Sequence, residues 1–432
     1  MAERRVLVRG GRVVDATGSR PADVLVAGAE VVAVEPDLPL ARGATVLDAD
    51  GCLVAPGLVD LHSHLRQPGR EEAETVESGS RAAALGGYTA VVAMPNTDPP
   101  IDTASAVREV LELGESVPCD VRVAGAITVG RRGDALAPMA EMAALGVRLF
   151  TDDGAGVQDA RLMRRALEYS SALGVTVAQH CEDAALAAGG HMHEGEWSSR
   201  LGIPGVPAEA EEVMVGRDIA LARLTAVLGS RLHLQHLSTA GSVAAVRAAR
   251  GQGLAVTAEA APHHFTLTDA AVASYDPVFK VNPPLRPRAD VDAVKAGLAD
   301  GTLDAIATDH APHAPEDKEL PFDAAPPGML GLETALALAL TELDLPPEAV
   351  LGLLSWRPAR IAGLEGLHGG PVVEGAPANL CVVDPAATWV VEPERLASRS
   401  RNTPYAGRKL TGRARHTILF GEPVVVDGVA QR

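Results

Sequence analysis

Two histidines one residue apart, His62 and His64, follow an apolar run from Leu53 to Leu61. In a β-strand, residues i and i+2 point to the same face, so both imidazoles should project together where the strand gives way to a loop. Two converging imidazoles make half of a metal site. Arg66 follows at once, and its planar guanidinium can hold a carboxylate through two hydrogen bonds. This stretch therefore suggests metal chemistry on an anionic substrate.

The middle of the chain supplies the elements that would position these side chains. Short apolar segments alternate there with Ala- and Leu-rich stretches of helical character. We expect strands at 58–64, 88–94, 120–127, 146–151, 174–180, 231–237, 253–260 and 303–309, and helices at 74–86, 102–114, 136–145, 159–173, 209–229, 240–251 and 288–300. Eight strands that alternate with helices predict an α/β fold with a (β/α)₈ TIM barrel.

The barrel prediction can be checked against the positions of the polar residues. Functional residues of such barrels lie at the C-terminal ends of the strands. In this sequence those ends carry His62 and His64, Asn96, Asp153, His180, His236 and Asp309. Histidines scattered through a core would not gather at one end of successive strands.

Four histidines and two aspartates at one mouth can hold two divalent metals. Nitrogen and carboxylate ligands without thiolates suit Zn²⁺ best, with Mn²⁺ or Co²⁺ as other choices. Two metals ~3.5–4 Å apart would share a hydroxide whose pKa falls toward ~7. A nearby carboxylate could accept the water proton and pass it to a leaving nitrogen. The expected reaction class is metal-assisted hydrolysis of an amide-like bond, or its reversal.

The two ends of the chain show a different pattern. Short β-rich bursts punctuated by glycine run from residue 5 to 50, and similar segments occur at 379–383, 389–391, 417–420 and 423–426. We expect one small β-sandwich built from both termini, with the barrel inserted between them. The expected domains are 1–55 and 367–432 for the two halves of the sandwich and 56–366 for the catalytic barrel.

The amino-acid composition limits the kinds of partner and the cellular compartment that we expect for this protein. The 432 residues carry a net charge of −18, which argues against nucleic-acid binding and against an anionic membrane surface. No apolar run of ~18 residues and no signal peptide is seen. The four cysteines form no C-x-x-C pair, which fits a reducing cytoplasm.

The motifs together resemble the amidohydrolase superfamily and, within it, the type I dihydroorotases. The resemblance rests on segments spread over nearly the whole chain: Asp60–Gly69 (DLHSHLRQPG), Ala93–Thr97 (AMPNT), Thr151–Gly154 (TDDG), His180–Asp183 (HCED), His236–Thr239 (HLST), Pro262–His264 (PHH), Asn282–Arg286 (NPPLR), Ala307–His313 (ATDHAPH) and Asn402–Pro404 (NTP). It implies a cytoplasmic enzyme that cyclises N-carbamoyl-L-aspartate to L-dihydroorotate reversibly in de novo pyrimidine biosynthesis.

The resemblance also implies roles for particular residues. His62, His64 and Asp309 would bind one Zn²⁺, His180 and His236 a second, and Asp153 together with a hydroxide would bridge them. Asp309 would also act as general base and acid. The substrate would be held by His64, Arg66, Asn96, Asn282, His313 and the backbone at Pro327 and Gly328. We expect a homodimer or a larger assembly, and aspartate transcarbamoylase is a possible partner.

This sequence departs from the family and its relatives in informative ways. Hydantoinases and allantoinases bridge their metals with a carboxylated lysine, but the first lysine here is Lys280, so Asp153 is the natural substitute. The family often has Phe-Gly where Pro327 and Gly328 stand, and proline has no N–H to donate. Gln67 stands where the family often has glutamate.

Two other functions stay open on the sequence alone. The chain could be another cyclic-amide hydrolase, hydantoinase- or allantoinase-like, although Arg66 and Asn96 suit a carboxylate. It could instead be an inactive structural partner of aspartate transcarbamoylase, although such a chain should have lost metal ligands.

Some neighbouring residues have plainer interpretations. We expect His263 and His264 to support the metal ligands rather than join them. Asp152 should face away from Asp153 as a hydrogen-bonding partner. His191 and His193, in a Gly-rich loop, should be solvated. Residues 314–328 should form an active-site lid.

Overall fold

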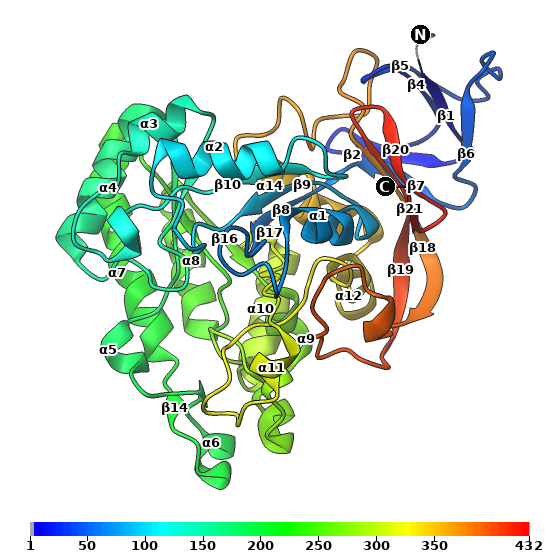
Figure 1. Ribbon diagram of the computed structural model, residues 1–432. Coiled ribbons are helices and arrows are strands. Elements are labelled where there is room, and N and C mark those ends of the chain that lie inside the picture. The colour runs from blue at the N-terminus through cyan, green and yellow to red at the C-terminus, as the bar shows by residue number, and fades with distance from the viewer. Residues whose placement is uncertain (1–3, 432) are drawn as a thin grey trace.

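The computed structural model describes residues 4–431 and has a mixed α/β architecture (Figure 1). Eight parallel strands and their flanking helices form its larger part. The strands are β8 Leu58–Ser63, β9 Tyr88–Ala93, β10 Asp120–Val123, β11 Leu149–Phe150, β12 Thr176–Gln179, β15 Arg231–Leu234, β16 Val256–Ala260 and β17 Ala305–Ile306. Each lies inside one of the eight segments expected to be strands, although most are shorter.

Pairing links these strands into a continuous circuit. β8, β9 and β10 form one parallel run, and β11, β12, β15, β16 and β17 form another. Two parallel bridges, Gly125 with Phe150 and Ser63 with His310, connect the two runs at both ends. The carboxyl ends of all eight strands therefore meet at one mouth.

Helices alternate with the strands of the circuit. They are α1 Val76–Leu85, α2 Ala104–Leu113, α3 Met139–Ala144, α4 Ala160–Leu173, α7 Glu209–Thr225, α8 Ala240–Gly251, α10 Arg288–Asp300, α12 Ala335–Glu342, α13 Pro347–Leu354 and α14 Trp356–Ile361. Shorter elements lie in the loops: α5 Ala184–Ala187, β13 Met192–His193, α6 Glu196–Leu201, β14 Gly205–Val206, α9 Pro262–Thr266 and α11 Pro315–Lys318. The seven helices that the sequence predicts are all present, with ends that differ from the expected ones by a few residues at most: α1, α2, α3, α4, α7, α8 and α10.

Local sequence explains where several helices begin and end. Thr75 caps α1 in a capping box with Ser78, and Asp159 accepts from the Leu162 N–H at the start of α4. α4 ends at Gly174, whose φ of 65° is the left-handed conformation that glycine adopts without strain. Such caps fix the ends of elements whose main stabilisation comes from buried apolar faces.

The terminal segments form two further sheets that share one core. Strands β1 Arg5–Arg9, β4 Asp23–Ala27, β5 Glu30–Glu35 and β6 Thr45–Asp48 make a four-stranded sheet in the order β5-β4-β1-β6. The other sheet has the order β21-β20-β19-β18-β7-β2-β3, with β2 Arg12–Asp15, β3 Gly18–Pro21, β7 Leu53–Pro56, β18 Leu380–Val390, β19 Lys409–Leu419, β20 Glu422–Val426 and β21 Val429–Ala430. Buried residues of both sheets, including Val24 and Val382, pack in one cluster.

Both ends of the chain thus contribute to one β-rich body (Figure 1). β18 from the C-terminal part runs antiparallel to β7 from the N-terminal part, with Leu380 opposite Pro56. The segment 389–391, expected to be a separate strand, is largely the continuation of β18, which ends at Val390. The pairing of β18 with β19 shifts register between Asp384 and Thr388, just before this segment.

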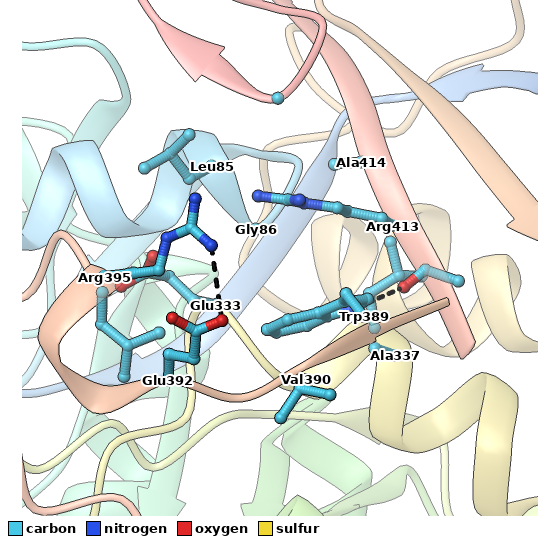
Figure 2. Close-up of a pocket in the computed structure, with 14 residues that line it drawn as sticks. Leu85, Gly86, Glu333, Ala337, Trp389, Val390, Glu392, Arg395, Arg413 and Ala414 are labelled. Carbon is cyan, nitrogen blue, oxygen red and sulfur yellow. Dashed lines mark hydrogen bonds and ion pairs between the residues drawn. The ribbon is translucent and has the colours of Figure 1, made fainter. Parts of the chain in front are cut away.

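A cavity of about 440 Å³ lies where α1 and α12 meet β18 and β19 (Figure 2). The guanidinium of Arg413 lies 5.5 Å from the ring centre of Trp389, whose indole N–H donates to the Gly412 carbonyl at 3.1 Å. None of the residues that the sequence assigned to metal or substrate lines this cavity.

None of the helices within residues 4–431 has the length and apolar character needed to cross a membrane.

Candidate active site

The strand ends bring two groups of possible metal ligands together. His62, His64 and Asp153 form one group, and Asp153, His180 and His236 form the other. Within each group the donor atoms all lie within 4.8 Å of one another, and all five side chains are buried. Asp153 belongs to both groups, as expected of a bridging ligand.

The Asp153 carboxylate is the centre of the cluster. Its Oδ1 lies 3.2 Å from His62 Nε2, 3.5 Å from His180 Nδ1 and 3.7 Å from His236 Nε2. Its Oδ2 lies 3.6 Å from His64 Nε2. Burial raises the pKa of Asp153, but the nearby imidazoles of His62, His180 and His236 hold the pKa well below its ordinary value. The carboxylate is therefore ionised and available to a cation.

The ring nitrogens that face Asp153 test whether a metal fits here. His62 Nε2 is buried and has no hydrogen-bond partner in the described part of the chain, and His180 Nδ1 and His236 Nε2 lie 3.0 Å from each other beside the same carboxylate. A buried polar atom without a partner is costly, and imidazole and carboxylate donors with no thiolate suit a divalent metal such as zinc. The donor set and the unpaired His62 Nε2 both fit a metal centre.

Asp309 lies beside the first ligand group. Its Oδ1 is 3.2 Å from His64 Nε2 and 3.6 Å from His62 Nε2, and its Oδ2 is 3.7 Å from His263 Nε2. Burial raises its pKa, yet the hydrogen bond from His64 and the nearby imidazoles lower the pKa below its ordinary value. Asp309 can therefore both face a metal and accept a proton.

Three residues at the mouth adopt backbone conformations that are unusual for residues other than glycine. The φ angles are 61° for Arg66, 34° for His236 and 47° for Asp309. Such conformations cost of order 1–3 kcal/mol each and persist where the surroundings over-determine them. One constraint is the His64 N–H, which donates to the His310 carbonyl at 2.8 Å and ties the two segments together.

A cavity of about 250 Å³ opens beside the metal ligands. Every residue that the sequence assigned to substrate lines it: His64, Arg66, Asn96, Asn282, His313, Pro327 and Gly328. It also includes Asp153, His180, His236 and Asp309, so ligands and substrate candidates share one space. The structure thus brings the whole predicted set together.

Arg66 is the only arginine among the residues that the sequence assigned to the substrate, and its side chain is buried. Its Nε donates to the Pro312 carbonyl at 3.1 Å, which anchors the side chain. Its terminal NH₂ groups have no hydrogen-bond partner within residues 4–431. Burial and the neighbouring Arg70 lower the pKa of Arg66 to about 10, so the guanidinium remains charged at neutral pH. A charged, anchored guanidinium with free donors suits an incoming carboxylate.

Asn96, His313 and Gly328 already have protein partners. Asn96 Oδ1 accepts from His64 Nδ1 at 2.9 Å, and His313 Nε2 donates to the Pro327 carbonyl at 2.8 Å. The Gly328 N–H donates to the Lys280 carbonyl at 2.9 Å. Because the Gly328 N–H is already bonded to Lys280, a ligand beside Pro327 and Gly328 would meet the Pro327 carbonyl instead. One lone pair of that oxygen accepts from His313, and the second would face the ligand.

The segment 314–328 covers one side of this cavity and is held by its lysine and acid side chains. Lys318 Nζ donates to the carbonyls of Pro326 at 2.7 Å and Pro277 at 3.2 Å. Asp317 forms an ion pair with Arg70 at 2.9 Å. Pro326, Pro327 and Gly328 from this segment line the cavity, so it occupies the position expected of a lid.

The supporting histidines behave only partly as expected. His263 faces Asp309, and His264 Nε2 donates to the Pro283 carbonyl at 3.0 Å, in agreement with a supporting role. The prediction that His193 is solvated was wrong: it is buried, and its Nδ1 accepts from Arg286 at 3.0 Å.

Sequence reasoning missed three buried residues behind the ligands. Glu259 on β16 contacts both His62 and His233, and Gln235 Nε2 lies 3.2 Å from His62 Nδ1. One signal was present, because a glutamate near the end of a strand that is otherwise Val, Thr and Ala is rarely buried without a partner.

Comparison with known proteins agrees with this site. Residues 51–242 match the family model described as Dihydro-orotase-like. The chain is 52% identical to a dihydroorotase of Streptomyces coelicolor, over 98% of this chain and 99% of the relative. It is 48% identical to one of Mycobacterium tuberculosis, with the same coverage.

Solved structures extend the comparison to the fold. An L-hydantoinase (dihydropyrimidinase) from Arthrobacter aurescens superposes with a TM-score of 0.87 at 26% identity, covering 99% of this chain and 97% of that one. A dihydropyrimidinase from Brevibacillus agri gives a TM-score of 0.84 at 25% identity, covering 99% and 96%. The fold is shared with these enzymes, and by its sequence the chain belongs to the dihydroorotase family.

Proposed function

We propose that this protein is a dihydroorotase, which interconverts N-carbamoyl-L-aspartate and L-dihydroorotate in de novo pyrimidine biosynthesis. The observation that carries the proposal is the cavity in which Arg66 shares space with two ligand groups joined by Asp153. The free guanidinium matches the carboxylate that both substrate and product bear. The relatives named dihydroorotase support the same reaction.

The metal centre that we propose holds two Zn²⁺ ions. His62, His64 and Asp309 would bind one, His180 and His236 the other, and Asp153 both. When bound, the metals would supply Lewis acidity toward the reacting carbonyl and lower the pKa of a water molecule. The absence of lysine before Lys280 favours this aspartate bridge over a carboxylated lysine.

Asp309 is the proposed general base and acid. In the ring-opening direction its carboxylate would accept the proton of the attacking water and return it to the ring nitrogen as the amide bond breaks. Its lowered pKa keeps it ionised and ready to accept that proton at neutral pH. In the ring-closing direction the same oxygen would take the proton from the ureido nitrogen and give it to the departing water.

Substrate orientation would come from the rest of the cavity. Arg66, Asn96 and His313 would supply hydrogen bonds to the carboxylate, while Asn282 and the backbone at Pro327 and Gly328 would contact the ring amides. Asn96 and His313 would exchange their present protein partners for the ligand. Such a fixed set of donors lowers the entropic cost of reaching the reactive geometry.

We propose that the eight-strand circuit is a (β/α)₈ barrel spanning 56–366, and that 1–55 and 367–432 form a β-sandwich. The boundary near residue 56 is supported by β7, which pairs with β18 and β2, whereas β8 pairs with β9. A cytoplasmic location and assembly as a homodimer or larger, with aspartate transcarbamoylase as a possible partner, complete the proposal.

The test compares substrates on the zinc-loaded enzyme. We expect hydrolysis of L-dihydroorotate with kcat/KM at least a hundredfold above that for dihydrouracil or hydantoin, since those rings have no carboxylate for Arg66. Equal rates on all three would instead support the hydantoinase alternative. Zinc binding without any turnover would support an inactive structural role.

A further inference from the structure

The carboxylate of Glu259, on strand β16 of the parallel circuit, is buried behind the metal ligands. It is about 1% exposed, and its neighbours on β16, Ala258 and Ala260, are fully buried. Transfer of a charged carboxylate into such surroundings is strongly unfavourable unless it is paired and hydrogen-bonded. Glutamate at this position therefore needs a specific reason.

Both oxygens of Glu259 are used by histidine rings. Oε1 lies 3.1 Å from His62 Nδ1, and Oε2 lies 2.9 Å from His233 Nε2. The His233 ring extends this series of hydrogen bonds, because its Nδ1 lies 2.9 Å from the Thr257 hydroxyl. A carboxylate held between two imidazoles accepts hydrogen bonds from both, so each facing ring nitrogen carries a proton.

One neighbour opposes this protonation state of His62. Gln235 Nε2 lies 3.2 Å from the same Nδ1 and would favour a ring that accepts there. A bond to an ionised carboxylate is roughly twice as strong as one between neutral groups. At 3.1 Å the bond to Glu259 is also the shorter of the two, so the proton stays on Nδ1.

We propose that Glu259 is a positioning residue for the metal centre: it fixes His62 with Nδ1–H inward and the Nε2 lone pair toward Asp153, and its charge strengthens His62 as a ligand. Nε2 lies 3.2 Å from Asp153 Oδ1 and has no hydrogen-bond partner of its own within residues 4–431. This inference rests on the proposed metal site.

The two histidines of the first strand are held differently. His64 Nδ1 faces the neutral amide oxygen of Asn96 at 2.9 Å, whereas His62 Nδ1 faces a carboxylate. A carboxylate partner raises the basicity of a ligand histidine more than an amide does. His62 should therefore be the stronger ligand.

A purely structural role makes a different prediction. If Glu259 only tied β8, β15 and β16 together, its loss would destabilise the metal-free protein and leave zinc affinity unchanged in the molecules that fold. A positioning role predicts the reverse pattern. Glu259→Gln keeps the shape and one acceptor oxygen but removes the charge, so it separates the two roles.

The experiment measures zinc affinity by competition with a chromophoric chelator, alongside the unfolding temperature of the metal-free protein. We expect Glu259→Gln to weaken binding of at least one zinc by roughly 10–100-fold. The matched control, Thr257→Val, removes only the hydroxyl that contacts His233, at the end of this hydrogen-bond series remote from His62. It should bind zinc like the wild type. Zinc affinity of Glu259→Gln within threefold of wild type would overturn the proposal.

A second measurement does not depend on a variant that folds. Nitrogen NMR of the histidine rings in the zinc-loaded wild-type protein should show His62 with Nδ1 protonated and Nε2 bound to metal, and the opposite tautomer would overturn the proposal. Neither readout uses turnover. If the wild type binds zinc but does not hydrolyse L-dihydroorotate, the proposed function fails and this inference stands. If turnover is normal and Glu259→Gln binds zinc unchanged, only this inference fails.

Discussion

Asp152 and Asp153 are adjacent in the sequence, yet their carboxylates belong to separate hydrogen-bond networks. Asp152 Oδ1 accepts from the N–H groups of Ile127 at 2.8 Å and Thr128 at 3.0 Å, and its Oδ2 accepts from the Thr128 hydroxyl. Asp153 faces the histidines of both ligand groups. One residue of strand register thus separates a loop anchor from a shared metal ligand.

This relationship predicts opposite metal contents for two alanine variants. Asp153→Ala should lose one or both metals, because the remaining ligands would place two cations together without an anionic bridge. Asp152→Ala should keep nearly full metal content while losing some stability. Metal analysis of both proteins under identical loading checks this, and added bicarbonate should rescue neither. Two metals in Asp153→Ala would rule out the bridge.

Arg66→Met should weaken substrate binding without changing metal content. A hydrogen bond to a charged group is worth ~1.5–3 kcal/mol, so KM should rise by roughly ten- to a hundredfold. Arg70→Met is the matched control, since Arg70 lines the same cavity but pairs with Asp317. If KM for L-dihydroorotate is unchanged in Arg66→Met, the arginine does not bind the carboxylate.

Asp309→Asn should keep the fold and much of the metal while nearly abolishing turnover. Loss of general acid–base catalysis costs ~10²–10⁴-fold, and the amide cannot accept the water proton. Steady-state kinetics together with metal analysis measure both effects. A variant that retains more than roughly a tenth of wild-type kcat would contradict the proton-transfer role.

The buried Asp218 gives a prediction about pH and stability. Burial raises its pKa from 3.8 to about 7 despite the pairing with Arg217, and its Oδ2 has no partner among residues 4–431. The folded state therefore holds a proton more tightly than the unfolded state. The stability due to that proton is fully present below the unfolded pKa and is lost as pH rises through about 7.

Asp218→Asn should remove this pH dependence. One pKa unit corresponds to ~1.4 kcal/mol, and the shift from 3.8 to about 7 already includes the pairing with Arg217, so we expect a gain of up to roughly 4 kcal/mol at about pH 8. The gain should vanish below about pH 4. Thermal unfolding across this pH range checks it, with the exposed Asp134→Asn as control. A constant difference between variant and wild type would contradict the shifted pKa.

The sequence predicted the site residues that lie at the ends of strands, because side chains along a strand alternate strictly between its two faces. The two-residue period placed His62 with His64 and turned Asp153 away from Asp152. It could not show that Glu259 reaches His62, since that contact joins residues 197 positions apart. Only the closed circuit of strands brings them together.

The three longer helices that follow the last strand of the circuit, α12, α13 and α14, were not predicted. α12 has the sequence ALALALTE and is buried on most sides, so it shows little contrast between a polar and an apolar face. The partners of His313 and Gly328 could not be predicted either, because these contacts depend on how the segment 314–328 folds over the cavity.

The most direct test of the central claim is a zinc titration of the metal-free protein, with hydrolysis of L-dihydroorotate followed by ultraviolet absorbance. The proposed two-metal centre predicts that activity rises with added zinc, reaches its plateau at two equivalents per chain, and stays near zero in Asp153→Ala throughout. A plateau at one equivalent would contradict the shared Asp153 bridge. Full activity in the continued presence of a strong chelator would contradict the metal centre itself.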